Sequence, residues 1–243
     1  MRGGEELGSL LIIIILFALG IGSMLLIFIG PKYLQFKSSK YKEKSGNSFS
    51  KTLFDKGNYG EFLTFRYLEK LNGHFRLLTN LYVPKKDGKT TEVDLVMLSE
   101  RGVYVFESKN YSGWIFGNEQ YKTWTQTLEN KQKHQFYNPI WQNNTHINAI
   151  KFALELDDEN MYKSYIVFSE RCTLKKINVT SKHVKVMKRN HLLKTIKQDI
   201  AYSDKIFSPY EVDQIFKKLQ QYSLADASIK EEHVRNIQRK IGN

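Results

Sequence analysis

The sequence predicts an α/β domain, a mixed β-sheet flanked by helices, that follows one transmembrane helix. Three observations indicate this fold class. A long uncharged apolar run lies near the start of the chain, a segment of helical periodicity precedes several strand-like segments, and a second helical segment leads back to a buried apolar strand. Such a return from a helix to a buried strand is typical of an α/β crossover.

The composition limits the class of protein. The chain has 243 residues, of which 41 % are apolar, and it carries 37 Lys and Arg against 25 Asp and Glu. This length allows one ordinary domain with appendages, and the apolar content excludes a largely disordered chain. The single cysteine, Cys172, excludes a disulfide-stapled miniprotein and favours a reduced, cytosolic setting. The net charge of +12 predicts a polyanionic partner, either a phosphate backbone or anionic lipid head groups.

The uncharged run extends from Leu10 to Ile29. At about 1.5 Å per residue, a helix of this length spans a hydrocarbon core of roughly 30 Å. We therefore expect a transmembrane helix over residues 10–30 and a short extracytoplasmic N-terminus over 1–9. The alternative, a cleaved signal peptide, is disfavoured because the flanking MRGGEEL has little positive charge and no small-residue cleavage site follows the run.

Lysines follow the apolar run and predict its orientation. The segment that follows the run has a single acid, Glu43, and five lysines: Lys32, Lys37, Lys40, Lys42 and Lys44. Because cytoplasmic flanks are enriched in Lys and Arg, we expect a single-pass protein with its N-terminus outside and its C-terminal domain in the cytoplasm. The same lysines make a lipid membrane an expected partner, and residues 31–50 are expected to form a basic polar tether.

A helix and three strands are predicted after the tether. Apolar residues at spacings of three and four indicate a helix over Lys51–Leu71, which ends before Asn72-Gly73. Strand-like segments follow at Phe75–Val83, Thr91–Leu98 and Val103–Lys109. The second and third are apolar over most of their length without alternation, so we expect central strands covered on both faces.

The second half of the chain alternates helices and strands. Asn138-Pro139 opens a helix that extends to Leu156, and two strands are expected at Ser164–Ser169 and His183–Met187. The capping box that begins at Ser208 starts a helix that extends to Tyr222. A further helix is expected over Ala225–Ile241. We assign residues 51–200 to the globular domain and 201–243 to a C-terminal helical extension.

Two carboxylates are predicted to face each other across the second and third strands. If the turn closes tightly at Glu100-Arg101, Asp94 lies directly opposite Glu107, with Cβ atoms about 5 Å apart. Oxygen ligands without His or Cys favour Mg²⁺ or Mn²⁺ between them. A bulge at Gly102 would instead move Asp94 opposite the next residue and split the site between the two faces.

Lys109 lies on the same side of the strand as Glu107, two residues away. Beside a metal-activated water, its ammonium group can orient that water and balance charge on a transition state, which outlines phosphodiester hydrolysis. The alternative is an ordinary cross-strand salt-bridge network. These charges lie within VDLVML and VYVFESK, however, where burial without compensation is costly.

The sequence resembles the NERD (nuclease-related) domain family of the PD-(D/E)xK restriction-endonuclease-like superfamily over about residues 56–170. The resemblance rests on NYGE at 58–61, TEVDLVML at 91–98, GVYVFESKNYSGWIFG at 102–117, Trp124 and NPIWQNNTH at 138–146. It implies a restriction-endonuclease-like mixed sheet flanked by helices and Mg²⁺-dependent cleavage of DNA.

The resemblance also implies further site residues. It places an additional acid, Glu61, on the first helix of the domain, and it places Gln142 near the site. We also assign the main-chain carbonyl of Ser108 to the metal. His146 lies on the same helical face as Gln142, and its role is open between packing and phosphate contact. One departure from the family pattern is Glu92, where glutamine is more usual.

Residues 171–198 are the predicted nucleic-acid contact, because they hold nine cations and no acid. The residues that we assign to nucleic acid are Lys175, Lys176, Lys182, Lys185, Lys188 and Arg189. A solvated surface or a membrane-facing surface is the alternative. The aromatic residues Trp114, Phe116, Tyr121 and Trp124 either stack on exposed bases or pack inside the domain.

These features predict a membrane-anchored, divalent-metal-dependent nuclease that hydrolyses DNA. The alternative is a non-catalytic module that keeps the fold and tethers nucleic acid or a membrane surface. The chain has no Gly-rich phosphate loop with a following lysine, so no nucleotide cofactor is expected. Whether the domain forms a homodimer is left open.

Overall fold

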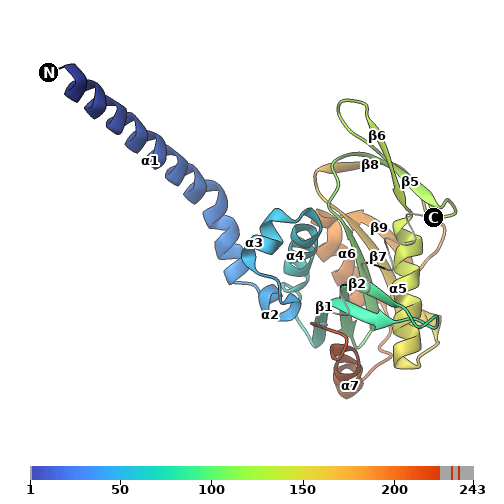
Figure 1. The fold of residues 1–243 in the computed structure, drawn as a ribbon. Coiled ribbons are helices and arrows are strands. Elements are labelled where there is room, and N and C mark those ends of the chain that lie inside the picture. The colour runs from blue at the N-terminus through green and yellow to red at the C-terminus, as the bar shows by residue number, and fades with distance from the viewer. Residues whose placement is uncertain (1, 225–230, 232–234, 236–243) are drawn as a thin grey trace.

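The structure, a computed structural model, describes residues 2–224 together with Glu231 and Arg235. The helix expected over Ala225–Ile241 otherwise lies outside the described residues. A globular domain follows the long helix α1 (Arg2–Lys37), which projects away from it (Figure 1). Two mixed sheets and their flanking helices confirm the predicted α/β class.

The larger sheet has five strands in the order β1-β2-β3-β7-β9. Their bounds are Phe75–Pro84, Thr90–Ser99, Gly102–Lys109, Tyr162–Phe168 and Val184–Lys188. The first three strands are antiparallel, and β7 and β9 continue the sheet in parallel from β3. Every strand predicted from the sequence is therefore present, and the parallel step from β3 to β7 is the expected crossover.

A second, four-stranded sheet in the order β6-β5-β4-β8 was not predicted. Its strands are Gly113–Asn118, Thr123–Thr127, Lys133–Tyr137 and Cys172–Asn178. β4 and β8 pair in parallel, as β3 and β7 before them do, so this sheet extends from the carboxyl ends of the central strands. Short polar strands give little periodic signal, because only a few residues such as Ile115 and Trp124 are buried.

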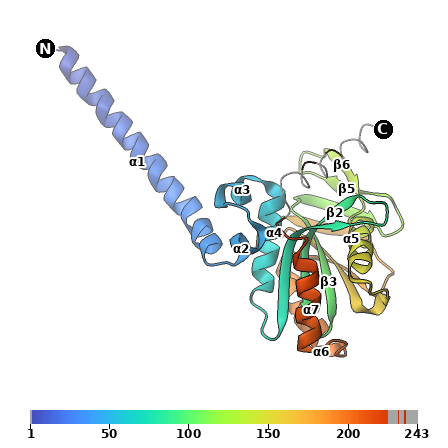
Figure 2. The same cartoon turned by 60° about the horizontal axis from the view of Figure 1, so that its bottom comes forward.

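Helices cover both faces of the larger sheet (Figure 2). One face packs Val103 and Val105 of β3 against α5 (Pro139–Leu154) and α7 (Pro209–Gln220). The alternate residues Tyr104 and Phe106 pack against α4 (Lys56–Leu68) and α6 (Arg189–Tyr202). This alternation confirms that β3 is a central strand.

The helix α7 is part of the core. Its predicted capping box is present, since Ser208 and Glu211 bond each other's backbone N–H groups. Val212 and Leu219 are fully buried against the sheet. The described part of the expected C-terminal extension is therefore a structural element of the domain.

The segment 31–50 is packed and largely helical, which corrects the expected tether. The helix α1 continues past Pro31 to Lys37, and α2 (Tyr41–Ser45) and α3 (Phe49–Phe54) follow. The physical reason is aromatic: Phe36 and Tyr41 are buried, and their rings contact Phe62 of α4.

The helix predicted over Lys51–Leu71 is in fact two helices that meet at Asp55. This residue ends α3, and its side chain accepts a hydrogen bond from the Asn58 N–H at the start of α4. Capping by an aspartate side chain favours a new helix start over continuation of the old one.

Within α1, the segment Leu10–Lys37 is 28 residues long, and its most apolar stretch of 18 residues has a mean hydropathy of 3.0. Its most apolar stretch makes no buried contact within the chain. By length and composition it is able to cross a membrane.

If residues 31–50 belong to the domain, Phe36→Ala should destabilise it. We expect a loss of about 3 to 5 kcal/mol in the free energy of unfolding, because a buried aromatic ring leaves a cavity. Urea unfolding of the full chain in detergent micelles measures the loss. Phe54→Ala is the matched control, since Phe54 is 79 % exposed. Equal stability of the two variants would show that the segment is a detached tether.

Candidate active site

The register of the β2–β3 hairpin brings Asp94 and Glu107 to one place. Leu95 pairs with Phe106 and Ser99 with Gly102, which is the tight-turn register and not the bulged alternative. Beyond Leu95 the Ser108 N–H donates to Asp94 Oδ2 at 2.9 Å. The carboxylates therefore lie where this strand pair ends.

Glu107 is the centre of a buried polar cluster. Its side chain is 2 % exposed, and its two oxygens accept from different partners. Lys109 Nζ lies 2.6 Å from Oε1, and His146 Nε2 lies 3.0 Å from Oε2. Lys109 Nζ also donates to Gln142 Oε1 at 3.0 Å, and His146 Nδ1 lies 2.9 Å from Thr91 Oγ1. Both ends of the carboxylate are thus held in place.

The helix α5 supplies the partners of Glu107 and Lys109. Asn138 caps it by accepting from the Ile140 N–H, and Pro139 occupies its first turn. Gln142 and His146, one turn apart, both point to β3. Because both nitrogens of the buried His146 are engaged within the protein, the structure favours packing and orientation over phosphate contact for this residue.

The charges in the cluster shift one another's protonation. Burial raises the pKa of Glu107, but Lys109 and His146 outweigh it and hold that pKa below its ordinary value. Burial lowers the pKa of Lys109, but the negative charges of Glu107 and Asp94 have the larger effect and raise that pKa above its ordinary value. Burial and the neighbouring Glu107 and Glu61 raise the pKa of Asp94 well above its ordinary value. Negative charge therefore exceeds positive charge when all the carboxylates are ionised.

Glu61 joins the cluster from α4. Burial, then Glu92 and Glu107, raise its pKa from 4.5 to about 8. The Tyr41 hydroxyl lies 3.5 Å from Glu61 Oε2. Glu92, the departure from the family pattern, accepts from the Tyr82 hydroxyl at 2.7 Å and contributes charge to the same region.

The donor set fits a magnesium-like ion. Within the part of the chain that the structure describes, no three His, Cys, Asp or Glu side chains converge as a complete metal cage. Asp94 and Glu107 offer two carboxylates, and the negative charges around Asp94 are only partly compensated by Lys109. Mg²⁺ is commonly held by one or two carboxylates while water and phosphate oxygens complete its coordination. The main-chain carbonyl of Ser108, which lies between Glu107 and Lys109 on β3, stays a predicted third ligand.

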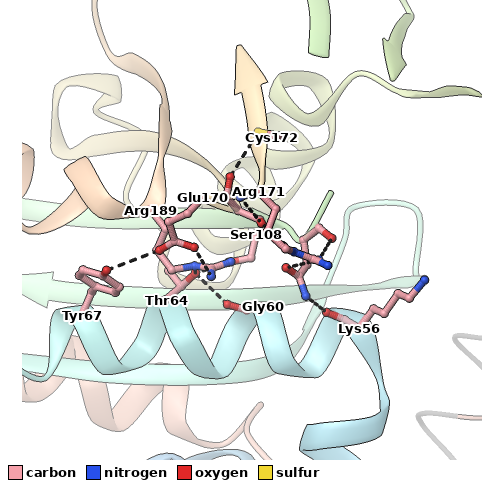
Figure 3. A network of polar contacts seen from close by, with 11 residues as sticks. Lys56, Gly60, Thr64, Tyr67, Ser108, Glu170, Arg171, Cys172 and Arg189 are labelled. Carbon is pink, nitrogen blue, oxygen red and sulfur yellow. Dashed lines mark hydrogen bonds and ion pairs between the residues drawn. The ribbon is translucent and has the colours of Figure 1, made fainter. Parts of the chain in front are cut away.

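A second network fixes Ser108 from the other face of the sheet (Figure 3). Thr64 Oγ1 of α4 accepts from Ser108 Oγ at 3.0 Å and from Arg189 Nε at 3.3 Å. The Arg189 guanidinium is buried and also pairs with Glu170, at 3.1 Å. Because the Ser108 N–H holds Asp94, this network orients the site indirectly.

The predicted nucleic-acid residues do not form one surface. Lys175, Lys176 and Lys182 are exposed on and after β8. Arg189 is buried, and Lys185 is ion-paired with Asp199 of α6. Lys188 is half-buried at the start of α6. Arg189 and Lys185 therefore serve the fold, and only the exposed lysines present free ammonium groups.

Several residues of the site gave no sequence signal. Thr64, Thr91 and Tyr41 are ordinary core or helix residues in the chain, and only the fold brings them to Ser108, His146 and Glu61. Asn80 is of a residue type that tolerates positive φ, and its φ is 55°. In the register of β1 and β2 it falls between the pairs Thr79–Leu95 and Leu81–Val93, across from Asp94. Beside it, Thr79 Oγ1 donates to the Asp94 carbonyl at 2.7 Å.

Comparison with known proteins agrees with this geometry. The chain matches the NERD, nuclease-related domain, family over residues 56–169, which include β2, β3 and α5. It is also 37 % identical to an uncharacterized protein of Bacillus anthracis over 187 residues, which are 76 % of this chain and 85 % of that protein. No solved structure gives a significant match. The chain belongs to the nuclease-related domain family.

Proposed function

We propose that the protein is a divalent-metal-dependent nuclease that hydrolyses DNA phosphodiester bonds. The single observation that supports this most strongly is the Lys109–Glu107 contact of 2.6 Å beside Asp94. A purely structural salt bridge has no need of a second carboxylate, Asp94, whose pKa is raised by burial and then by Glu107. Unbalanced negative charge next to a fixed ammonium group suits a cation and a phosphate.

Each residue has a role in this proposal. Asp94 and Glu107, with the Ser108 carbonyl, would hold Mg²⁺ or Mn²⁺, which when bound polarises the phosphate and lowers the pKa of a water molecule. Lys109 Nζ orients the attacking water and balances the developing charge. Gln142 Oε1 and Glu107 Oε1 fix that ammonium group. Glu61 supplies a further carboxylate at the edge of the site.

We further propose that α1 anchors the domain to a membrane and that the domain lies on the cytoplasmic side. The apolar stretch is able to span the bilayer. The five lysines between residues 32 and 44 support the orientation, because such residues are enriched on the cytoplasmic flank.

Lys109→Ala should slow cleavage strongly under conditions in which circular dichroism shows that the variant is still folded. We expect a rate at least about a hundred-fold lower, because a positioned charge at the transition state is lost. The measurement incubates the full chain in detergent micelles with supercoiled, linear and single-stranded DNA in Mg²⁺ or Mn²⁺.

Two controls make this result specific. Lys218→Ala removes an exposed lysine of α7 and should leave cleavage unchanged. EDTA should stop cleavage by the wild-type protein. Cleavage that persists in Lys109→Ala or in EDTA would contradict the proposed metal mechanism, and absence of cleavage by the wild type would favour the non-catalytic module.

Glu61→Gln should change how stability depends on pH in EDTA. With a pKa of about 8 when folded and 4.5 as its ordinary value, Glu61 binds a proton in the folded state that the unfolded state has released. The contribution of Glu61 to stability therefore falls as pH rises from about 5 to about 8, and levels off above it. Glutamine stays neutral at every pH, so the variant does not lose stability in this way as the pH rises.

Urea unfolding at pH 5.5, 7 and 8.5 tests the predicted fall of stability with rising pH. These pH values span roughly the window between the two pKa values. The stability of the wild type relative to Glu61→Gln should decrease at each step. Glu129→Gln, at an exposed position in the turn after β5, is the control. A constant difference between wild type and Glu61→Gln would contradict the raised pKa.

A further inference from the structure

We infer that the outer face of the β6-β5-β4-β8 sheet binds single-stranded nucleic acid, with Trp114 as a base-stacking platform. This inference rests on the proposed function, because it names the strand state of the substrate for the same site. It concerns the sheet that the sequence did not predict, and whose exposed aromatic residues the fold of the domain does not require.

The two faces of this sheet differ. Ile115 of β4 and Trp124 of β5 are buried against the core. Because side chains alternate along a strand, Trp114 and Phe116 lie on the opposite face. Trp114 is 51 % exposed, although an indole buried in the sheet would stabilise it far more. A tryptophan ring that is half exposed on a sheet face is available to stack on a planar ligand such as a base.

The close packing of the inner face explains why Trp114 stays outside. A Cβ atom at Gly117 would lie 2.2 Å from the ring of Trp124, so that ring occupies the space that a side chain would fill. The inner side of the sheet is therefore already filled, and the outer side keeps the second tryptophan.

The charge of this sheet suits a phosphate backbone. Its four strands contain no Asp or Glu, and they carry Lys133, Lys175 and Lys176. The Lys175 ammonium lies 4.9 Å from the centre of the Trp114 ring, so a cation and an aromatic ring are presented together. The neighbouring acid Glu119 is engaged by the Thr180 and Ser181 N–H groups.

The sheet leads directly to the candidate active site. β4 begins at Gly113, shortly after Lys109 ends β3, and β6 leads into α5, which carries Gln142. Nucleic acid bound along this sheet therefore lies next to the strand that carries Glu107 and Lys109. Since a base in a duplex is already stacked on both faces, Trp114 selects unpaired bases. Lysines alone would bind duplex and single strand alike.

Binding to labelled oligo(dT) of about twelve nucleotides, within the usual site size of such platforms, tests the inference. The probe and a duplex of equal length are titrated by fluorescence anisotropy into the full chain in detergent micelles, with EDTA to prevent cleavage. We expect Trp114→Ala to weaken oligo(dT) binding roughly ten-fold and duplex binding less than about two-fold, and Trp114→Phe to restore most of the affinity. Lys175→Ala should reduce the slope of the logarithm of the binding constant against the logarithm of the salt concentration by about 0.7 in magnitude, because one phosphate contact is lost.

Controls separate this inference from the proposed function. Tyr210→Ala removes a ring that is 71 % exposed on α7 and should not affect binding. Because EDTA prevents cleavage, binding is measured without catalysis, so a failure of catalysis leaves this test intact. Unchanged oligo(dT) affinity in Trp114→Ala, or an equal loss for oligo(dT) and duplex, would overturn the inference even if the protein cleaves DNA.

Discussion

The burial of the Glu107 carboxylate is the constraint on which the site depends. A carboxylate on a side chain that is 2 % exposed must be neutralised, and removing one partner of such a group costs about 3 to 5 kcal/mol. Lys109 on the same strand and His146 on α5 supply the compensation from two directions. The placement of α5 on the sheet, through Val105 and its neighbours, is therefore also a requirement of the charge at Glu107.

A second consequence concerns Asp94, which Lys109 compensates only in part. Its oxygen accepts from the Ser108 N–H, and Ser108 is held in turn by Thr64 and Arg189. Two polar networks on opposite faces of the sheet thus fix the two carboxylates separately. The charge of Glu107 is matched by Lys109 and His146, whereas burial and neighbouring carboxylates disfavour the ionised form of Asp94. Precise positioning of an unbalanced charge is the usual property of a catalytic site, since a structural network is balanced.

The sequence was sufficient for the central strands, because their apolar runs and turn residues are local signals. The predicted tight turn at Glu100-Arg101 is confirmed by the register from Leu95 to Ser99, and Asp94, Glu107 and Lys109 lie close enough to shift one another's pKa. The packed segment around Tyr41 was not predicted, because its aromatic residues are separated by lysines and find their partners only in α4. The burial of Arg189 was equally hidden, since a cation within a basic segment resembles a surface residue until Glu170 is placed beside it.

We propose that Asp94 and Glu107 together hold a divalent cation. Titration calorimetry of Mn²⁺ into the full chain in detergent micelles tests this metal site without any assumption about the substrate. We expect saturable binding that Asp94→Asn weakens at least about ten-fold, because one of two carboxylate ligands is lost. Asp87→Asn, at an exposed turn, should bind as the wild type does. Equal Mn²⁺ binding by the wild type and Asp94→Asn, or none by either, would rule out the proposed metal site.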